Sequence, residues 1–594
     1  MKGHSTMTRY AVHFILACVL ATPLQMFAQE DNGSSAAAVQ STTANVTPSL
    51  PAIEFTSKTE LVLVPVVVSR NGLPVTGLKK EDFKVFENGK EQKVAIFEDI
   101  QADSSPVTVN KRRQPELQQF SNMQVDQRQP KRLVIIVLDL INTSFSDRAY
   151  ARQQLVKYLS SGVDDEALVS LVALGRGHVR VLHDFTSRPG VLAAALNKAL
   201  GSNEKSAAVE NLPPDQSKIF ESEVNRLSGF LEDGRFAGMP FGSSHGESML
   251  TWMRVRETLD GLNLIAQAYA GIPGRKALIW ATGGFPFQLD GSTMQIPSVR
   301  MERIDTQDLS SILAYYEETW RLMNNSNFAV YPLDLRGLVT TNITAADHVN
   351  VNARNPGRPM ERRIAREMDT VSTFGTFADM TGGRAYYNTN DLARSFKLAT
   401  QDSASYYLLA YYVDTNAVRE KGTNWRKLKV KVDVSGVDVR ARSGYFMNKA
   451  PDATLKDEID LALSSPLDFT GLPVTVRWID RGSEAQGDAQ AGRKKVKFEV
   501  ILPPDAAAID GSDNNAVSLK IVASARSSDA TEVNGITQTI TGHVTQETMR
   551  KMHTTGFTFK SDIGLPRGSY SVRFVVHDNL SGRTGSVAAP VTVN

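Results

Sequence analysis

The sequence predicts an α/β protein with a doubly wound, mostly parallel sheet flanked by β-sandwich domains. Between residues 131 and 412, short apolar runs alternate with amphipathic stretches of helical period. That alternation favours parallel strands with helices on both faces of the sheet. The segments on either side instead show period-2 alternation broken by turn residues, which is typical of antiparallel sandwiches. A chain of 594 residues is long enough for several such domains.

The charge balance argues against a nucleic-acid partner. The chain has 66 Lys plus Arg and 64 Asp plus Glu, a formal net charge of +2. Such a balance provides no long-range field for gathering DNA or RNA, and no basic stripe with interleaved aromatic residues is present in the sequence. We therefore expect no nucleic-acid partner.

The first residues have the features of an export signal. Lys2 and Arg9 precede an apolar stretch over 10–23, and Ala28 ends a small-residue cleavage motif. Residues 1–28 are therefore a predicted signal peptide, and no later stretch reaches the roughly 18 apolar residues of a spanning helix. We expect an exported protein that is periplasmic, secreted or on the outer surface, with no transmembrane span after cleavage. The sequence leaves lipidation at Cys18, the only cysteine, open.

Several segments flank the central region. Residues 29–52 and 101–131 are polar and predict linkers, whereas 53–100 contains β-branched runs and Asn-Gly turns. The 413–447 segment also alternates like a strand pair. Neither β segment has enough strands to close a core alone, so we hypothesise that they pair into one sandwich. Residues 468–594 predict an immunoglobulin- or fibronectin-like sandwich.

The central region 131–412 supplies the predicted parallel sheet. Its helices follow the i, i+3, i+4, i+7 rule, as in Leu309, Ile312, Leu313, Tyr316, Trp320 and Met323. Two polar stretches, 201–250 and 340–365, predict surface insertions. The predicted strands are 132–138, 167–174, 178–183, 276–282, 327–332 and 405–412.

The candidate site lies at the carboxyl ends of these strands, where open α/β sheets bind ligands. The first strand ends in an acid followed by small polar residues, and the fourth ends in a threonine and two glycines. The predicted ligand-binding rim comprises Asp139, Asn142, Thr143, Ser144, Thr186, Thr282, Gly283 and Gly284.

Over 131–412 the pattern resembles the von Willebrand factor A domain, which has a Rossmann-like topology. That family's metal-ion-dependent adhesion site begins with Asp-x-Ser-x-Ser at the first strand end. Here Asp139 is followed by Ile141 and Thr143 at the two serine positions, and Gly283 replaces the acid of the later Thr-Asp-Gly. The adhesion site is therefore degenerate.

Further segments resemble a variant group of these proteins described from acidobacteria. The segments that carry this resemblance are Leu138-Asp139 with Asn142-Thr143, Gly274-Arg275-Lys276, Gly283-Gly284-Phe285-Pro286, Thr381-Gly382-Gly383-Arg384 and Arg442-Ser443-Gly444-Tyr445.

The resemblance implies a cation site whose ligands would be Asp139 and Thr143, with Mg²⁺ or Ca²⁺ as the candidate ions. A third ligand would come from Thr251 or Thr258. The losses at Ile141 and Gly283 remove oxygen ligands and should weaken binding of a hard cation. The alternative is that Asp139 caps the following helix or braces its loop, with local bonds from the residues after it.

The leading functional hypothesis is non-enzymatic adhesion or binding of a protein or surface ligand at the rim. One alternative is a hydrolase that uses the same rim, with Asp139 and His183. However, the sequence has no His-Glu-x-x-His and no Gly-x-Ser-x-Gly, and no Gly-x-Gly-x-x-Gly follows the first strand. A second alternative is a structural or assembly factor of the cell envelope.

Overall fold

The computed structural model describes 59–101, 113–114, 118–123, 132–160, 167–175, 178–201, 243–285, 306–338, 370–402, 404–414, 425–447, 455–483, 493–512, 514–529 and 531–593. These residues belong to one compact unit that begins at Ser57. The predicted signal peptide 1–28, the linker 29–52, the insertion 340–365 and most of the insertion 201–250 lie outside the described residues. No helix in the described ranges is long and apolar enough to cross a membrane.

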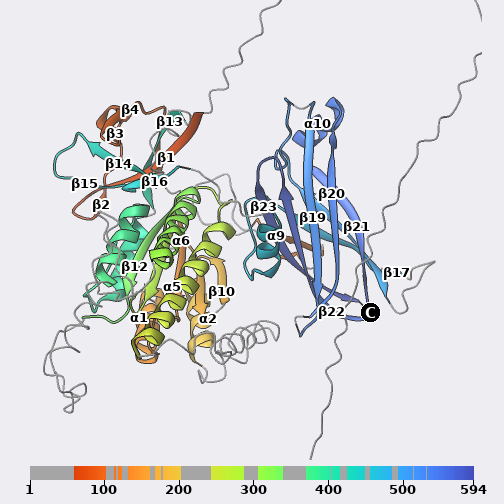
Figure 1. Cartoon of the computed structure of the whole chain (residues 1–594), viewed down its shortest axis with the longest axis horizontal. Coiled ribbons are helices and arrows are strands. Elements are labelled where there is room, and N and C mark those ends of the chain that lie inside the picture. Colours follow the sequence, from red (N-terminus) through yellow and green to blue (C-terminus); the bar gives the residue numbers. More distant parts are fainter. Residues whose placement is uncertain are drawn as a thin grey trace, which may run out of the picture. The chain divides into compact units, whose positions relative to one another are not determined.

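The predicted fold class is wrong for the chain. Within the described ranges, four of the five sheets are antiparallel, and the remaining sheet is mixed, with strand order β10-β9-β8-β11-β12 (Figure 1). The mixed sheet has parallel pairs along β9-β8-β11-β12, but β10 is antiparallel to β9. Only two residues separate β9 from β10, and such a short connection permits only an antiparallel pair. The doubly wound parallel sheet is therefore not formed.

The mixed sheet lies between two groups of helices (Figure 1). Helices α1, α2 and α8 pack on one face, and α5 and α6 pack on the other. The bounds are β8 Arg132–Asp139, β9 Ala167–Gly175, β10 His178–Thr186, β11 Lys276–Thr282 and β12 Phe328–Asp334 for the strands, with α1 Phe145–Ser160, α2 Pro189–Gly201, α5 Ser243–Ala268, α6 Thr306–Asn325 and α8 Leu392–Gln401 for the helices.

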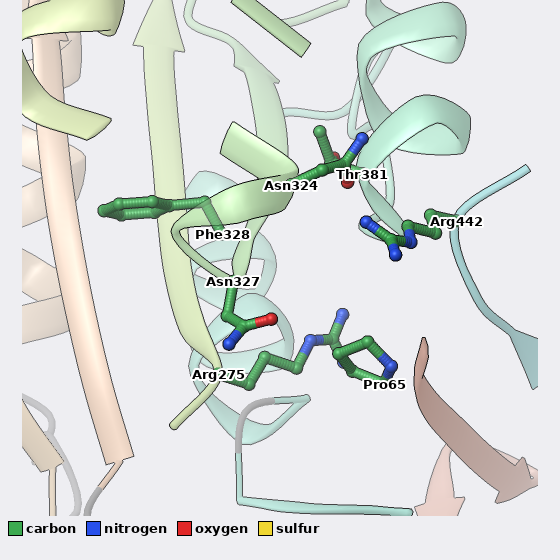
Figure 2. Close-up of a pocket in the computed structure, with 7 residues that line it drawn as sticks. All are labelled: Pro65, Arg275, Asn324, Asn327, Phe328, Thr381 and Arg442. Carbon is green, nitrogen blue, oxygen red and sulfur yellow. The ribbon is translucent and has the colours of Figure 1, made fainter. Parts of the chain in front are cut away.

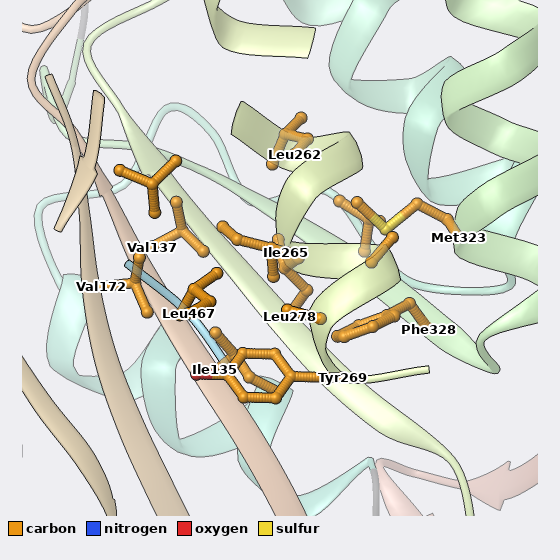
Figure 3. Close-up of a cluster of buried hydrophobic side chains, with 14 of the residues drawn as sticks. Ile135, Val137, Val172, Leu262, Ile265, Tyr269, Leu278, Met323, Phe328 and Leu467 are labelled. Atoms are coloured by element: carbon orange, nitrogen blue, oxygen red, sulfur yellow. The ribbon is translucent and has the colours of Figure 1, made fainter. Parts of the chain in front are cut away.

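The core on the α5–α6 side explains why these segments fold together. Ile135 from β8 and Leu278 from β11 contact the apolar faces of the helices, which contribute Ile265 and Met323 (Figure 3). Leu467, from the chain leading to the C-terminal sandwich, belongs to the same cluster. Strands buried on both faces need nearly continuous apolar sequence, and this requirement accounts for the run from 133 to 138.

The strand predicted at 405–412 does not join the mixed sheet. Strand β13 (Ser405–Asp414) pairs antiparallel with β1 (Thr59–Arg70) and β5 (Ile96–Gln101). Its alternate residues Tyr407, Leu409 and Tyr411 fill a different core. A continuous apolar run is compatible with either location, so the sequence pattern could not distinguish them.

An N-terminal sandwich forms from segments far apart in the chain. The segments 53–100 and 413–447 pair directly, since β1 is beside β15 and β3 is beside β14. One sheet has the order β15-β1-β13-β5 and the other β16-β14-β3-β4. The remaining bounds are β2 Leu73–Pro74, β3 Phe83–Glu87, β4 Lys90–Gln92, β14 Trp425–Val432, β15 Asp438–Arg440 and β16 Gly444–Phe446.

The C-terminal sandwich consists of two antiparallel sheets, β21-β18-β17-β7-β6 and β20-β19-β22-β23, around one core. Its bounds are β6 Arg113–Gln114, β7 Gln119–Ser121, β17 Thr475–Ser483, β18 Lys494–Leu502, β19 Ala516–Arg526, β20 Glu532–His543, β21 Phe557–Leu565, β22 Gly568–Asp578 and β23 Arg583–Val593, with helices α9 Leu455–Ser464 and α10 Gln546–Thr554.

The predicted linker 101–131 is wrong where it contributes β6 and β7 to this sandwich. Phe120 is buried in the sandwich core. The side chain of Asn122 donates to the carbonyls of Phe469 (2.7 Å) and Leu472 (2.8 Å) and accepts from the amide of Val474 (2.8 Å). A three-residue strand held by one aromatic and one amide is too short to show a period in the sequence.

Candidate functional site at the strand tips of the mixed sheet

The register brings three strand ends to one edge of the mixed sheet. Asp139 pairs with Thr282, and Thr282 pairs with Asp334. Because β8, β11 and β12 run parallel, the loops that follow them emerge on the same side. We call this edge the rim and define it as residues 139–144, 282–285 and 334–338.

Asp139 is almost fully buried at the rim, with 1% of its surface exposed. Its Oδ1 accepts hydrogen bonds from the backbone amides of Ile141 and Asn142, both at 3.0 Å. Its Oδ2 accepts from Nδ2 of Asn142 at 2.8 Å and from the indole Nε1 of Trp280 at 3.1 Å. Four N–H donors thus converge on one carboxylate, which fixes the turn that follows β8.

Asn142 links this turn to helix α5. Its Nδ2 also donates to Oγ1 of Thr258 at 2.8 Å, and Thr258 in turn donates to the carbonyl of Arg254. Thr258 was one of the two predicted third ligands and does lie at the site. Thr251, the other, has no described side chain. The amide nitrogen of Asn142 therefore lies between the two oxygens that a shared cation would have to approach.

Gly283 lies directly against the loop after β8. Its amide donates to Oγ1 of Thr143 at 2.9 Å, and the same hydroxyl donates to the carbonyl of Asp139. A Cβ at position 283 would be 2.9 Å from the Cα of Thr143 and 3.0 Å from the carbonyl oxygen of Asn142. Glycine is therefore required by the close approach of two backbones, and an acid at this position would displace the loop.

Burial dominates the electrostatics of Asp139. It raises the pKa of this carboxyl above its ordinary value, and the hydrogen bonds from Asn142 partly oppose that shift. With 1% of its surface exposed and both oxygens already accepting hydrogen bonds, this group braces the turn and presents no free oxygen to an external molecule.

The residues present do not fit the cation that the family resemblance implies. Both oxygens of Asp139 already accept from N–H groups, and the hydroxyl of Thr143 is committed to Asp139 and Gly283. A hard cation needs several free oxygens. In the described part of the chain, no group of three or more His, Cys, Asp or Glu side chains is placed to hold a metal ion.

Three further predicted residues, Ser144, Gly284 and Thr282, lie at the rim but make different local contacts. Ser144 is exposed, and its Oγ donates to Asp147 at 2.6 Å while accepting from the Asp147 amide, an arrangement local to the start of α1. Gly284 follows Gly283 at the rim with φ +131°. Thr282 is buried, and its hydroxyl donates to the carbonyl of Gly284 at 3.0 Å.

Thr186 does not lie at the rim. It pairs with Val169, which pairs with Val134 near the start of β8. Because β10 runs antiparallel to its neighbours, its final residue lies at the opposite edge of the sheet from Asp139. The prediction assumed that 178–183 was another parallel strand, and the short β9–β10 connection is the signal that argued otherwise.

The pair required by the hydrolase alternative is not assembled. His183 pairs with Leu171, three residues before the partner of Asp139 on β9. The Nδ1 of His183 contacts the carbonyl of Asp184 at 2.6 Å, whereas the carboxylate of Asp139 is enclosed by Asn142 and Trp280.

Two arginines at the rim were not predicted from the sequence. Arg336 is bidentate to the buried Asp334, through Nε at 2.9 Å and Nη2 at 2.7 Å, and Arg148 donates from Nη2 to the carbonyl of Leu140 at 2.6 Å. Asp334 could have been found by the rule that singled out Asp139, because it is also an acid at a strand end. Arg148 has no comparable sequence signal, since it reaches the rim from the first turns of α1.

The comparisons with known proteins assign no family to the chain: no family model and no curated protein matches it.

Proposed function

We propose that this chain is an exported, non-enzymatic binding protein that engages a protein or surface ligand at the rim of its mixed sheet without a metal ion. The single observation that carries the proposal is the saturation of Asp139 by four N–H donors. These bonds make the rim a preorganised surface, and they leave the carboxylate unable to coordinate a cation.

The exposed chemistry of the rim also supports binding. Leu338 is 53% exposed and lies two residues after Arg336, whose side chain is 24% exposed. Ser144 is exposed on the loop that follows β8. Protein recognition surfaces combine apolar contacts with polar groups at their margin. A rim held by backbone and amide contacts costs little conformational entropy when it binds.

The test compares a rim variant and a control variant of the full chain. The double variant Ser144→Arg and Leu338→Arg places bulky charges on the rim without touching the bonds of Asp139. The control Val191→Arg places one such charge on α2, where Val191 is 39% exposed just beyond the edge of the sheet that holds Thr186. Binding of each purified chain to intact cells and to solubilised envelope proteins of the producing organism is measured with Mg²⁺ and with EDTA.

We expect the rim variant to lose binding by about tenfold or more, as for a disrupted central contact, while the control binds like the wild type. EDTA should leave all three unchanged. Equal binding by the rim variant and the wild type would refute the rim as the binding surface. Loss of wild-type binding in EDTA would refute its metal independence.

A further inference from the structure

A small, partly open pocket lies where the mixed sheet meets the N-terminal sandwich. Its volume is about 10 Å³, and its lining includes Arg275 just before β11, Arg442 between β15 and β16, Asn324 at the end of α6, and Thr381. Three segments that stand out in the sequence, around Arg275, Thr381 and Arg442, thus converge on one cavity. Figure 2 shows both guanidinium groups directed into the same space, with Asn324 and Thr381 beside it.

Arg275 is 4% exposed, and only some of its hydrogen-bond donors have partners. Its Nη2 donates to the hydroxyl of Tyr331 at 3.2 Å and to the carbonyl of Gly382 at 2.6 Å. Its Nη1 is buried and has no hydrogen-bond partner. The Nη1 group of Arg275 therefore presents unused N–H donors at the cavity.

Arg442 approaches from the sandwich side and is 9% exposed. Its Nη2 donates to the carbonyl of Leu63 at 2.6 Å, and its guanidinium carbon lies 5.4 Å from the ring centre of Tyr445. Its Nε is buried without a partner. Burial lowers the pKa of this guanidinium to about 10, so its charged form lacks adequate compensation.

No carboxylate in the described part of the chain forms an ion pair with either arginine. Every acceptor that the two side chains use is neutral. Asp379 is nearby in the chain, and its carbonyl accepts from the amide of Ser443 at 2.8 Å, but the pKa of its carboxyl is raised by burial alone. Two buried cations without a counter-charge are strongly unfavourable.

We propose that this cavity binds one small monovalent anion of the halide class, bridging Arg275 and Arg442. The anion would accept from the two unsatisfied guanidinium donors and neutralise charge that the protein leaves uncompensated. A water molecule could accept the same hydrogen bonds but would bring no charge. The cavity holds roughly one water-sized particle, so we expect sulfate and phosphate to be too large for it.

The expected consequence is that the anion fastens the sandwich to the mixed-sheet domain. The two surfaces already approach closely, since a Cβ at Gly382 would lie 2.9 Å from the backbone nitrogen of Arg442. An ion shared by one arginine from each side adds a link that neither side forms alone. This inference concerns a site remote from the rim and does not depend on the proposed function.

The test measures thermal unfolding of the full chain at constant ionic strength while sodium gluconate is replaced by sodium chloride or bromide. We expect a saturable rise in Tm of roughly 2 °C with either halide, and no saturable rise with sulfate. Arg275→Gln and Arg442→Gln should each abolish the halide response. Arg384→Gln is the matched control, because Arg384 is 42% exposed and pairs with Asp438 outside this cavity.

A second measurement uses the wild-type chain, so that the proposal can be tested even if the glutamine variants do not fold. Crystals of the wild-type chain grown in sodium bromide should show an anomalous peak between Arg275 and Arg442. Solvent density without an anomalous peak would identify a water and overturn the proposal. A halide response that persists in both glutamine variants, or an equal Tm in chloride and gluconate, would overturn it as well.

Discussion

The side-chain amide of Asn142 donates to the carboxylate of Asp139, three residues earlier, at 2.8 Å. The same nitrogen reaches Oγ1 of Thr258 on α5 at 2.8 Å. An uncharged donor therefore joins two oxygens from separate elements. The rim is consequently held together by the protein's own hydrogen bonds.

Replacing that amide tests its role directly. Asn142→Asp would substitute an acceptor for the donor, so that the introduced carboxylate and the oxygens of Asp139 and Thr258 surround one point. We expect Mn²⁺ or Mg²⁺ to raise the Tm of this variant and not that of the wild type, because carboxylate and hydroxyl oxygens suit hard cations. The measurement is thermal unfolding with metal and with EDTA.

Asn142→Ala is the matched control for that experiment, since it removes the amide without adding an acid. It should be destabilised and should not respond to metal. A wild-type chain that responds to Mn²⁺ as strongly as the aspartate variant would show that the amide does not fill the place of a cation.

Asp139→Asn should destabilise the chain in a pH-dependent way. The new NH₂ group would oppose two of the four donors, and each unsatisfied donor costs about 1–3 kcal/mol. Burial raises the folded pKa of Asp139 above its unfolded value near 4. Its titration therefore contributes stability below the unfolded pKa, and that contribution is lost as the pH rises through the folded pKa.

The difference in unfolding free energy between wild type and Asp139→Asn should accordingly be largest near pH 4 and narrow toward pH 8. Urea denaturation across that range measures it. A difference that widens with pH would mean that the hydrogen bonds to the ionised carboxylate outweigh its burial.

Gly283→Ala tests the backbone contact that excludes an acid from the rim. The added Cβ would meet the Thr143 backbone at 2.9 Å, so overpacking of about 1–3 kcal/mol is expected. Gly375→Ala is the control, because residue 375 is helical and nothing lies within 4 Å of the place that its added methyl group would take. That control should be neutral or stabilising by about 0.5–1 kcal/mol. Chemical denaturation measures the free energy of unfolding of both variants. Equal values for Gly283→Ala and Gly375→Ala would refute the steric explanation.

Asp139 and Gly283 could be predicted to lie at one edge of the sheet because strand ends have a local sequence pattern. An acid or small residues follow an apolar run there. It could not place Thr186, because the direction of β10 depends on the connection between strands and not on the strand's own composition. The same limit applies to β13, whose apolar run fits a parallel sheet and an antiparallel sandwich equally well.

Contacts between residues that are far apart in the chain were even harder to predict from the sequence. The indole of Trp280 reaches Asp139 across neighbouring strands, and Asn122 anchors a distant sandwich from a segment that is polar in sequence. Neither side chain belongs to a periodic sequence pattern from which its contact could be predicted. The predicted fold class failed for a related reason: the flanking segments contribute many short strands, and their pairing makes most of the sheets antiparallel.

Lys276 provides a test at the opposite end of β11. It is 1% exposed, and its Nζ donates to the carbonyls of Ile272 and Gly274. Burial lowers its pKa to about 7 from 10.5. Between these values the unfolded chain binds more protons than the folded chain, so the stability of the wild type should rise with pH, by at most about 1.4 kcal/mol per pH unit from this group.

Lys276→Met keeps the apolar stem against Phe328, whose ring lies 5.6 Å from the ammonium nitrogen, and removes the buried charge. The variant should be more stable than the wild type at pH 6, where the lysine must be charged in both states, and should lose that advantage as the pH approaches 10. Urea denaturation at pH 6, 8 and 10 measures both chains. An advantage that stays constant over this range would show that the carbonyl groups of Ile272 and Gly274 compensate the charge fully, because the lysine would then titrate alike in the folded and unfolded chains.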